Sequence, residues 1–220
     1  ESVMSAARVL VLTTTYPRFQ GDTEPAFVHY LNQQLVGRGA EVHALAPHCK
    51  GAKACENLDG VNVHRFRYLP ECLENLAYDG GIMPKLKQSP WLIWQMPFLF
   101  LAMFLYAIYF VRKFKITHIH AHWVVPQGLI GVAIKAMTFG RVKVIVTSHG
   151  ADLFSLKGRV FQRIKAWVFA KADAVAVVSN DMKTYCQNVL AVTKPIHVYS
   201  MGIDTKKLFS QIMVGKLQNV

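Results

Sequence analysis

Short runs of apolar and β-branched residues alternate along this chain with longer segments of helical periodicity. The clearest run is V-I-V-T-S-H-G-A-D at residues 144–152, where apolar and β-branched residues end in a polar turn. A short run bounded by Ser and Gly predicts a strand that is buried on both faces, as in a parallel sheet. The other predicted strands are residues 8–15, 41–46, 61–67, 116–120, 173–178 and 196–199.

Helices are predicted between these strands. The apolar positions of the first one are Phe27, Tyr30, Leu31 and Leu35. Asp22 or Thr23 can cap that helix. Further helices are predicted over residues 126–139, 159–171 and 181–190, with a loop over 47–60 and irregular structure over 70–90. In the helix over 159–171, we expect Val160 on the apolar face and Lys165 off it, among the basic residues of a solvated surface.

Strand and helix alternate about six times along the chain. Such alternation predicts an α/β fold with a doubly wound, mostly parallel sheet of about six to seven strands. In an open sheet of this kind, ligands bind at the carboxyl ends of the strands. We expect one domain over residues 1–209, followed by a tail or the start of a crossover at 210–220.

Residues 91–111 form an uncharged, apolar segment that is long enough to span a bilayer. Lys85 and Lys87 precede it, and Arg112 and Lys113 follow it. Three interpretations stay open. If the segment spans a membrane, the strands before and after it lie on opposite sides and cannot form one sheet. If it is a helix buried in the core, its apolar residues can face every side, as they do here. A helix at the membrane interface agrees best with the flanking cations and with the Trp and Tyr residues.

Composition points to the kind of partner. The 220 residues carry a formal net charge of +12, with 52% hydrophobic residues and a mean hydropathy of +0.23. The charge indicates an anionic partner, such as a phosphorylated substrate, an acidic lipid or nucleic acid, and the apolar content favours contact with a membrane. The four cysteines form no C-x-x-C pair, which is typical of reduced thiols in a cytosolic protein. No secretory signal peptide and no nucleic-acid module is recognisable.

The turn that ends the V-I-V-T-S run carries the strongest candidate for chemistry. His149 can donate a hydrogen bond to a hydroxyl or phosphate oxygen, or move a proton near neutral pH. Gly150 allows a ligand to approach the backbone closely. Asp152 either contacts the ligand or caps the helical turn that follows. His122 and Trp123 follow another predicted strand, where they either contact a ligand or pack under the next helix.

Several familiar sites are excluded by their missing motifs. There is no G-x-G-x-x-G dinucleotide fingerprint, no P-loop and no G-x-S-x-G serine elbow. His120 and His122 lie two residues apart, but no carboxylate or cysteine stands at a helpful spacing, so we expect no metal site.

Gly21 lies in an unusually long turn after the first predicted strand, where the start of the next helix favours an anion.

Five motifs follow one another in a characteristic order. They are V-L-V-L-T-T-T-Y-P with the Gly21 turn, H-I-H-A-H-W, V-T-S-H-G-A-D, A-V-V-S and M-G-I-D-T-K-K-L-F. Together they resemble the N-terminal half of the family 4 retaining glycosyltransferases, which are two-domain GT-B enzymes. The resemblance implies a Rossmann-like domain that binds the acceptor, is often docked on a membrane, and works with a second domain that binds the nucleotide-diphosphate sugar.

The resemblance also implies roles for individual residues. The family's first-turn glycine, which approaches the donor diphosphate, matches Gly21, with Asp22 beside it. The family's cleft histidine, which contacts the transferred sugar, matches His149, the candidate catalytic residue. The implied acceptor contacts are Arg18, His122, Trp123, Gly150 and Asp152. No metal or other cofactor is implied beyond the donor sugar.

The implied activity is transfer of a hexosyl group from a nucleotide-diphosphate sugar to a lipid-linked or polysaccharide acceptor, with retention of configuration. The family's C-terminal donor-binding domain is missing from these 220 residues, so we expect the isolated chain to be inactive. We also expect a cytoplasmic protein on the inner face of the cytoplasmic membrane. The alternative is a non-catalytic module that binds a membrane or an anion through a degenerate cleft. The glycosyltransferase interpretation requires the loops at Gly21, His122 and His149 to converge on one rim.

Overall fold

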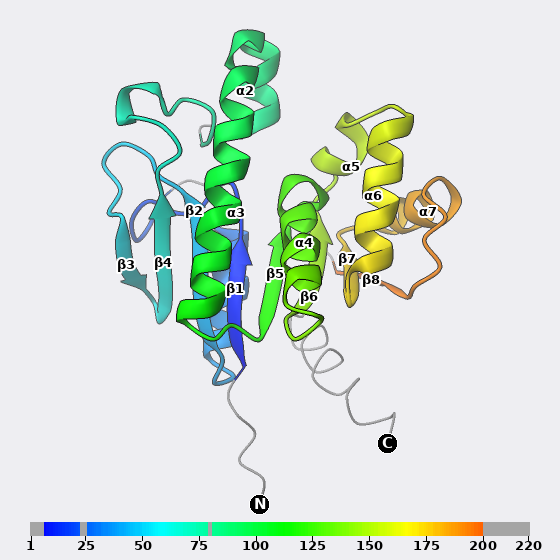
Figure 1. Cartoon of the computed structure of the whole chain (residues 1–220), viewed down its shortest axis with the longest axis horizontal. Coiled ribbons are helices and arrows are strands. Elements are labelled where there is room, and N and C mark those ends of the chain that lie inside the picture. The colour runs from blue at the N-terminus through cyan, green and yellow to red at the C-terminus, as the bar shows by residue number, and fades with distance from the viewer. Residues whose placement is uncertain (1–6, 23–25, 79–80, 200–220) are drawn as a thin grey trace, which may run out of the picture. The chain divides into compact units, whose positions relative to one another are not determined.

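The computed structural model describes residues 7–22, 26–78 and 81–199. Contacts divide the chain into two compact units, Glu1–Ile119 and His120–Val220. Each unit has its own group of strands with helices packed against them (Figure 1). The tail at 210–220 and the M-G-I-D-T-K-K-L-F motif lie outside the described residues. One domain over 1–209 stays a prediction.

Four strands of the first unit lie in the order β3-β4-β2-β1. They are β1 (Arg8–Leu12), β2 (Glu41–Pro47), β3 (Cys55–Leu58) and β4 (Val61–Phe66). Both β1 and β4 pair with β2 in parallel. Every β2 residue after Glu41 is buried, which is the pattern of a parallel strand covered on both faces.

The strand β3 corrects the prediction of a loop over residues 47–60. It pairs in antiparallel with β4 across Asp59 and Gly60, whose φ angles are 50° and 86°. Two positive φ angles are what a two-residue Asp-Gly hairpin turn requires, so this dipeptide was the sequence signal for the hairpin. The strand β3 therefore takes the outer edge, and β4 lies between β3 and β2.

Helices cover the strands of the first unit. They are α1 (Phe27–Val36), α2 (Ile82–Gln88) and α3 (Met96–Lys113), with short 3-10 turns at Glu71–Leu73 and Pro90–Gln95. The helix α2 corrects the expectation of irregular structure over 70–90. The helix α1 packs on β2 and β4, whereas α3 packs on β1, β2 and β4 and lies in front of them in Figure 1.

The helix α3 contains most of the apolar segment at 91–111. Leu99, Met103, Ala107 and Phe110 recur every three or four residues and are buried. This stripe is the core-facing side of an amphipathic helix. The opposite side is also apolar but faces outward, so α3 is a core helix on one side only. The outward residues of α3 and of the 3-10 turn at Pro90–Gln95 before it are here together named the outer face of α3. They are Trp91, Trp94, Phe98, Leu101, Leu105 and Tyr109, each at least 39% exposed.

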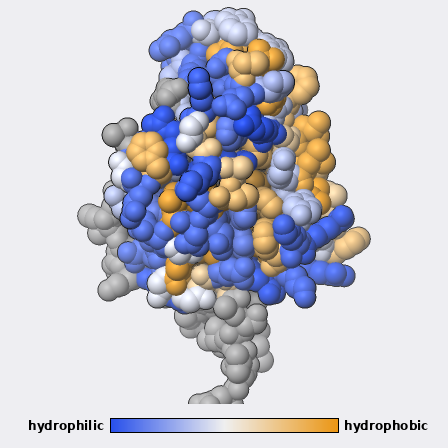
Figure 2. Space-filling view, turned by 90° about the vertical axis from the view of Figure 1, so that its left-hand side faces the viewer, coloured by the Kyte–Doolittle hydropathy of each residue, from blue (hydrophilic) through white to orange (hydrophobic). Residues whose placement is uncertain are grey.

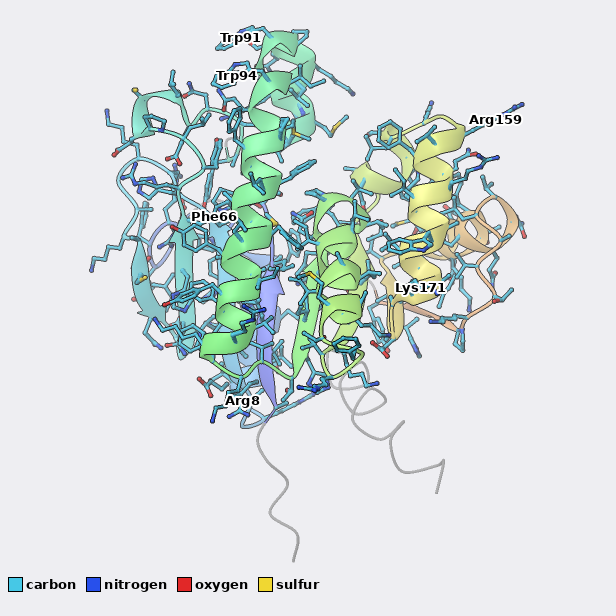
Figure 3. All side chains as sticks on the ribbon, viewed as in Figure 1. Arg8, Phe66, Trp91, Trp94, Arg159 and Lys171 are labelled. Atoms are coloured by element: carbon cyan, nitrogen blue, oxygen red, sulfur yellow. The ribbon has the colours of Figure 1, made fainter. Side chains whose placement is uncertain are left out.

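The outer face of α3 is visible in two further views. Figure 2 shows hydrophobic residues gathered along its right-hand edge, on the side where α3 lies. Figure 3 shows Trp91 and Trp94 together near the amino end of α3, with Phe66 farther down against the same helix. Among the described residues, Pro90–Lys113 is the one helix that could cross a bilayer by length and composition.

The second unit has strands in the order β5-β6-β7-β8. They are β5 (His118–His122), which begins in the first unit, β6 (Lys143–Ser148), β7 (Ala174–Val177) and β8 (Ile196–Val198). The last three pair in parallel. Every β6 residue after Lys143 is buried, as the apolar run predicted. The helical elements are a π turn at Val124–Gly128, α4 (Leu129–Met137), α5 (Ala151–Ser155), α6 (Arg159–Lys171) and α7 (Asn180–Asn188).

The prediction of an α/β fold with mostly parallel strands is confirmed. Eight strands are present in the described part of the chain, and the one that was not predicted is β3. The predicted helix over 159–171 matches α6, but its faces were assigned wrongly. Lys165 is fully buried, whereas Val160 is 68% exposed. The error arose because the buried stripe of α6 continues through Val168 and Phe169, to which Lys165 is adjacent at helical spacing.

Candidate functional site

The carboxyl ends of β5 and β6 bring two predicted site residues together. His122 is the last residue of β5, and His149 follows the last residue of β6. Nδ1 of His122 lies 2.9 Å from Nε2 of His149, so the two imidazoles share one hydrogen bond. Their rings stack with centroids 5.2 Å apart and 13° between the planes. Both side chains therefore lie at the edge where ligands bind in α/β sheets.

Trp123 belongs to the same cluster. The centroid of its ring lies 5.1 Å from that of His149. Its φ of 77° is in the left-handed region, which a bulky residue adopts at a cost in free energy. Its backbone N–H donates to the carbonyl of Thr147 on β6 at 2.7 Å. This hydrogen bond holds the turn after β5 against β6.

His120 extends the cluster along β5. Its ring centroid lies 4.2 Å from that of His122, and its Nε2 lies 2.9 Å from the hydroxyl oxygen of Thr147. Within the described ranges, no group of three or more His, Cys, Asp or Glu side chains is arranged to hold a metal ion. The rings of His120, His122 and His149 lie next to one another, and His122 and His149 are joined by a hydrogen bond.

Burial makes these imidazoles hard to protonate. It lowers the pKa of His149 to about 4 and, with a smaller contribution from His149, that of His120 to about 3. Burial, together with the two neighbouring imidazoles, also holds the pKa of His122 well below its usual range. A neutral imidazole offers one N–H donor and one bare nitrogen acceptor. At neutral pH the cluster therefore presents hydrogen-bonding groups rather than positive charge.

The carboxylate of Asp152 ties the loop after β5 to the turn after β6. One oxygen accepts from the backbone N–H of Val124, and the other accepts from the hydroxyl of Ser148 at 2.8 Å. Asp152 is buried, and burial raises the pKa of its carboxyl although these hydrogen bonds oppose the shift. The side chain thus joins two loops that carry site residues. Its contact with an acceptor stays a prediction.

Gly150 directs the chain from β6 into α5. Its φ of 101° lies in the region that favours glycine. A Cβ atom at this position would come within 3.7 Å of Sδ of Met182, which is ordinary van der Waals contact. The glycine is therefore needed for the direction of the backbone rather than for space.

Lys165 supports the same turn from α6. Its Nζ donates to the carbonyl of Leu153 at 2.6 Å and to the carbonyl of Leu156 at 2.9 Å, at the end of α5. Burial lowers the pKa of Lys165, and the charge of Asp152 opposes that shift. The sequence carries no signal for this role, because the partners are carbonyls of a helix on another segment.

A second cluster of predicted residues lies in the first unit, in the turn after β1. Asp22 accepts hydrogen bonds from the backbone N–H, Nε and Nη2 of Arg18, each at 2.8 Å. Gly21 beside it has a φ of 83° and open space where a Cβ would stand. Asp22 therefore pairs with Arg18, and the N-cap residue of α1 is Ala26, which makes no side-chain hydrogen bond. Thr23, the other predicted cap, lies outside the described residues.

Two residues that sequence reasoning missed anchor this turn. The guanidinium of Arg65 on β4 is buried, and its Nη2 donates to the carbonyl of Pro17 at 2.6 Å. The hydroxyl of Tyr16 lies 2.7 Å from Nδ1 of His29 on α1, and burial raises the pKa of that hydroxyl. A signal for Arg65 was present in the alternation of β4, which places it on the same side as the buried Val63.

Residues 26–207 match the family model of Glycosyltransferase Family 4. The chain belongs to this family. A sucrose-phosphate synthase from Thermosynechococcus elongatus has a similar structure, with a TM-score of 0.60, 15% identity and 96% of each chain covered. The catalytic domain of starch synthase IV from Arabidopsis thaliana, bound to ADP and acarbose, matches with a TM-score of 0.56 and 12% identity. That match covers 92% of this chain and 52% of the starch synthase chain.

The similarity to these two enzymes shows that the family 4 chain has the fold of GT-B glycosyltransferase domains. The chain spans about half the length of the starch synthase chain it matches. Among curated proteins, none matches the chain significantly. The resemblance to the N-terminal domain of this family is confirmed.

The family 4 domain carries one group of predicted residues in each unit. The second unit brings His122, Trp123 and His149 together, and the first unit joins Arg18 to Asp22. Convergence of the two groups on one rim stays a prediction. The individual contacts with donor and acceptor stay predictions as well.

Proposed function

We propose that this chain is the acceptor-side domain of a retaining glycosyltransferase. It moves a hexosyl group from a nucleotide-diphosphate sugar to a lipid-linked or polysaccharide acceptor. The observation that carries the proposal is the His122–His149 pair at the ends of β5 and β6. Membership of family 4 supports it, because a glycosyltransferase needs hydrogen-bonding groups for sugar hydroxyls at such a position.

His149 is proposed to orient the transferred sugar as the catalytic residue of this domain. Because burial lowers its pKa to about 4, its imidazole is neutral at physiological pH. Glycosyl transfer develops positive charge on the sugar ring in the transition state. A neutral donor can bind a sugar hydroxyl without opposing that charge, whereas a protonated histidine would oppose it.

The Gly21 turn is proposed to bind the diphosphate of the donor. No side chain crowds Gly21, so a phosphate oxygen can approach the backbone N–H groups of this turn. Asp22, proposed as the second diphosphate contact, is paired with Arg18, which reduces its repulsion of an anion. The proposed acceptor contacts are Arg18, His122, Trp123, Gly150 and Asp152. The proposal involves no metal and no cofactor besides the donor sugar.

The remaining donor contacts are proposed to come from a C-terminal domain that binds the nucleotide sugar. The 220 residues alone should therefore show little or no transfer when assayed with a panel of nucleotide sugars. The same chain joined to a family 4 donor domain should be active. Robust transfer by the 220 residues alone would contradict the proposal that a second domain supplies the remaining donor contacts.

Replacement of His149 tests the function in the chain joined to a donor domain. His149→Asn should lower kcat for hexosyl transfer by roughly 10²-fold, the usual effect of removing one group that stabilises a transition state. His197→Asn on β8 is a matched control that should leave transfer unchanged. Circular dichroism should show both variants folded. Equal kcat values for His149→Asn and the unsubstituted enzyme would overturn the proposed role.

We also propose that the outer face of α3 rests on an anionic membrane, from which the acceptor is taken. Trp91 is 64% exposed and Leu101 is 57% exposed, so burial in lipid would remove apolar surface from water. Tryptophan and tyrosine favour the headgroup level of a bilayer. Arg112 and Lys113 are exposed at the carboxyl end of α3, where they can meet acidic headgroups. We propose that the protein lies on the inner face of the cytoplasmic membrane.

The alternative function, a non-catalytic module that binds a membrane or an anion, shares the outer face of α3. The two functions differ at His149. Membrane binding without transfer of any sugar, even after a donor domain is joined, would favour the alternative. Nucleic acid is not a proposed partner.

A further inference from the structure

We propose that Asp59, in the hairpin turn between β3 and β4, is a positioning residue for the Gly21 turn after β1. Its carboxylate holds that turn at two places, at Gln20 directly and at Tyr16 through the imidazole of His29. The effect on donor binding rests on the proposed function of the Gly21 turn, whereas the positioning itself rests on hydrogen bonds within the first unit.

The carboxylate of Asp59 accepts hydrogen bonds from two segments of the chain. Nε2 of His29 on α1 lies 3.0 Å from Oδ2 of Asp59, and Nε2 of Gln33 donates to the same oxygen at 2.8 Å. The other oxygen, Oδ1, accepts from Nε2 of Gln20 at 3.4 Å. Gln20 directly precedes Gly21. A single side chain of the hairpin therefore joins α1 to the Gly21 turn.

The carboxylate also decides which nitrogen of His29 carries a proton. An ionised carboxylate only accepts hydrogen bonds, so the Nε2 that faces it has to donate. A bare Nε2 would place its lone pair against the carboxylate oxygen at 3.0 Å, where the two would repel each other. Nε2 of Gln33 lies 3.3 Å from Nε2 of His29 because both nitrogens donate to the same oxygen of Asp59. In a neutral ring, Nδ1 of His29 is then bare and acts as an acceptor.

Nδ1 of His29 holds Tyr16, which lies at the beginning of the Gly21 turn. The hydroxyl oxygen of Tyr16 lies 2.7 Å from Nδ1 and accepts from Nδ2 of Asn32 at 3.2 Å. The buried hydroxyl thus has one partner as a donor and another as an acceptor. The rings of Tyr16 and His29 meet edge to face, with centroids 5.4 Å apart and 87° between the planes. The orientation of the imidazole, and with it the position of Tyr16, therefore depends on Asp59.

These hydrogen bonds hold the segment that leads to Gly21 at both ends. Successive backbone N–H groups bind a phosphate oxygen when they point into one concavity. A turn that is ordered before the donor arrives loses less conformational freedom on binding, which improves affinity. Without Asp59, the turn has to be ordered both in the substrate complex and in the transition state, so both are destabilised equally. Such a change raises KM and leaves kcat unchanged.

Nitrogen NMR of the 220-residue chain with isotope-labelled histidine tests the arrangement at His29, because protonated and bare ring nitrogens resonate in separate regions. We expect a proton on Nε2 of His29. A bare Nε2 would overturn the proposal. The measurement needs no transferase activity, so its failure is distinguishable from failure of the proposed function.

Asp59→Gly tests whether Asp59 is the cause. Glycine removes the carboxylate but keeps the positive φ of 50° at this position of the hairpin turn. The backbone order parameter of Gly21 should fall from about 0.85, the value of rigid backbone, to below about 0.6. An unchanged order parameter would overturn the proposal. If this variant does not fold, the ring nitrogens of His29 in the unsubstituted chain decide.

Two further variants serve as controls for Asp59→Gly. Asp59→Asn keeps an oxygen that can accept from His29 and Gln33, and it should keep the Gly21 turn ordered. Asn62→Ala removes the 3.2 Å hydrogen bond that Asn57 donates to Asn62 in the same hairpin, and it should leave the turn unchanged. Loosening of the turn in Asn62→Ala to the same extent as in Asp59→Gly would overturn the proposal, because general weakening of the hairpin would then explain both.

Kinetics of the chain joined to a donor domain test the consequence for sugar transfer, with the donor that the panel of nucleotide sugars identifies. Asp59→Gly should raise KM for that donor roughly tenfold and leave kcat nearly unchanged, and Asp59→Asn should restore the low KM. A loosened turn with an unchanged KM would support positioning by Asp59 and contradict the proposed diphosphate contact of the Gly21 turn.

Discussion

The carboxylate of Asp152 accepts a hydrogen bond from the backbone N–H of Val124, a residue 28 positions earlier in the chain. The bond joins the loop that follows His122 to the turn that carries His149. Because the hydroxyl of Ser148 donates to the other carboxylate oxygen, one buried side chain holds both segments. The spacing of the paired histidines therefore depends on the carboxylate of Asp152, which accepts hydrogen bonds from both segments.

Replacing Asp152 by Ala should lower the free energy of unfolding by about 3 kcal/mol, because it removes two hydrogen bonds and leaves the N–H of Val124 buried without a partner. Urea unfolding monitored by circular dichroism measures the change. Ser148→Ala removes one of the two bonds and should cost about 1 kcal/mol. Equal losses in the two variants would show that Asp152 does not join the loops in the way described.

Lys165→Met should loosen α5 without unfolding the second unit. Methionine fills a similar volume but leaves the carbonyls of Leu153 and Leu156 without their donor. Amide hydrogen exchange should become faster in residues 151–156. Arg163→Met, at an exposed position of the same helix, is the control and should leave exchange unchanged. Equal protection of α5 in both variants would contradict the supporting role of Lys165.

The outer face of α3 should bind vesicles that contain acidic lipid. Replacing Trp91 and Trp94 by Ser should weaken the partition coefficient by about tenfold for each side chain, equivalent to about 1.4 kcal/mol of lost apolar burial. Phe139→Ser removes another exposed aromatic residue, 90% exposed, and should have no effect. Binding should also weaken as salt is raised. Equal binding to neutral and acidic vesicles would refute the electrostatic part of this prediction.

Folding stability should fall in mild acid partly through His64. Burial, with the charges of His43 and Lys113, lowers the pKa of His64 to about 4 from its ordinary value of 6.5. Between these two values the unfolded chain binds a proton that the folded chain does not, so stability is lost as pH falls from about 6.5 towards 4. His64→Phe keeps a ring against Phe110, whose centroid is 4.6 Å away.

The measurement is the urea midpoint between about pH 7 and pH 5, whose slope reports the protons taken up on unfolding. His64→Phe should reduce that uptake by about one proton at most. If the slopes of His64→Phe and the unsubstituted chain coincide, His64 is not a source of the acid sensitivity.

Two particular elements show how far sequence reasoning reached. The V-I-V-T-S run predicted β6 and placed His149 at its end, because an uninterrupted apolar run reports burial on both faces. The Asp59–Gly60 dipeptide is the sequence signal for the β3–β4 hairpin, but the segment before it was predicted as a loop. In both cases neighbouring residues carried enough information to predict the element, and in the second case the hairpin signal was not recognised.

Lys165 illustrates an error that no local pattern could have prevented. It is a charged residue whose expected place was a solvated surface. Lys165 instead donates to the carbonyl of Leu153 in α5. A charge can be buried when several partners converge on it, and convergence depends on how the segments are packed.

By itself, the sequence determined the alternation of strands and helices, the α/β class, the family resemblance and the place of His149 at the end of a strand. These follow from apolar runs and turn residues that act over a few neighbours. Only the tertiary structure decided that His122 shares a proton with His149 and that Asp152 holds the N–H of Val124. Such partners are separated by more than twenty-five residues, and they meet only after parallel strands have paired in one register, which the order of amino acids does not display locally.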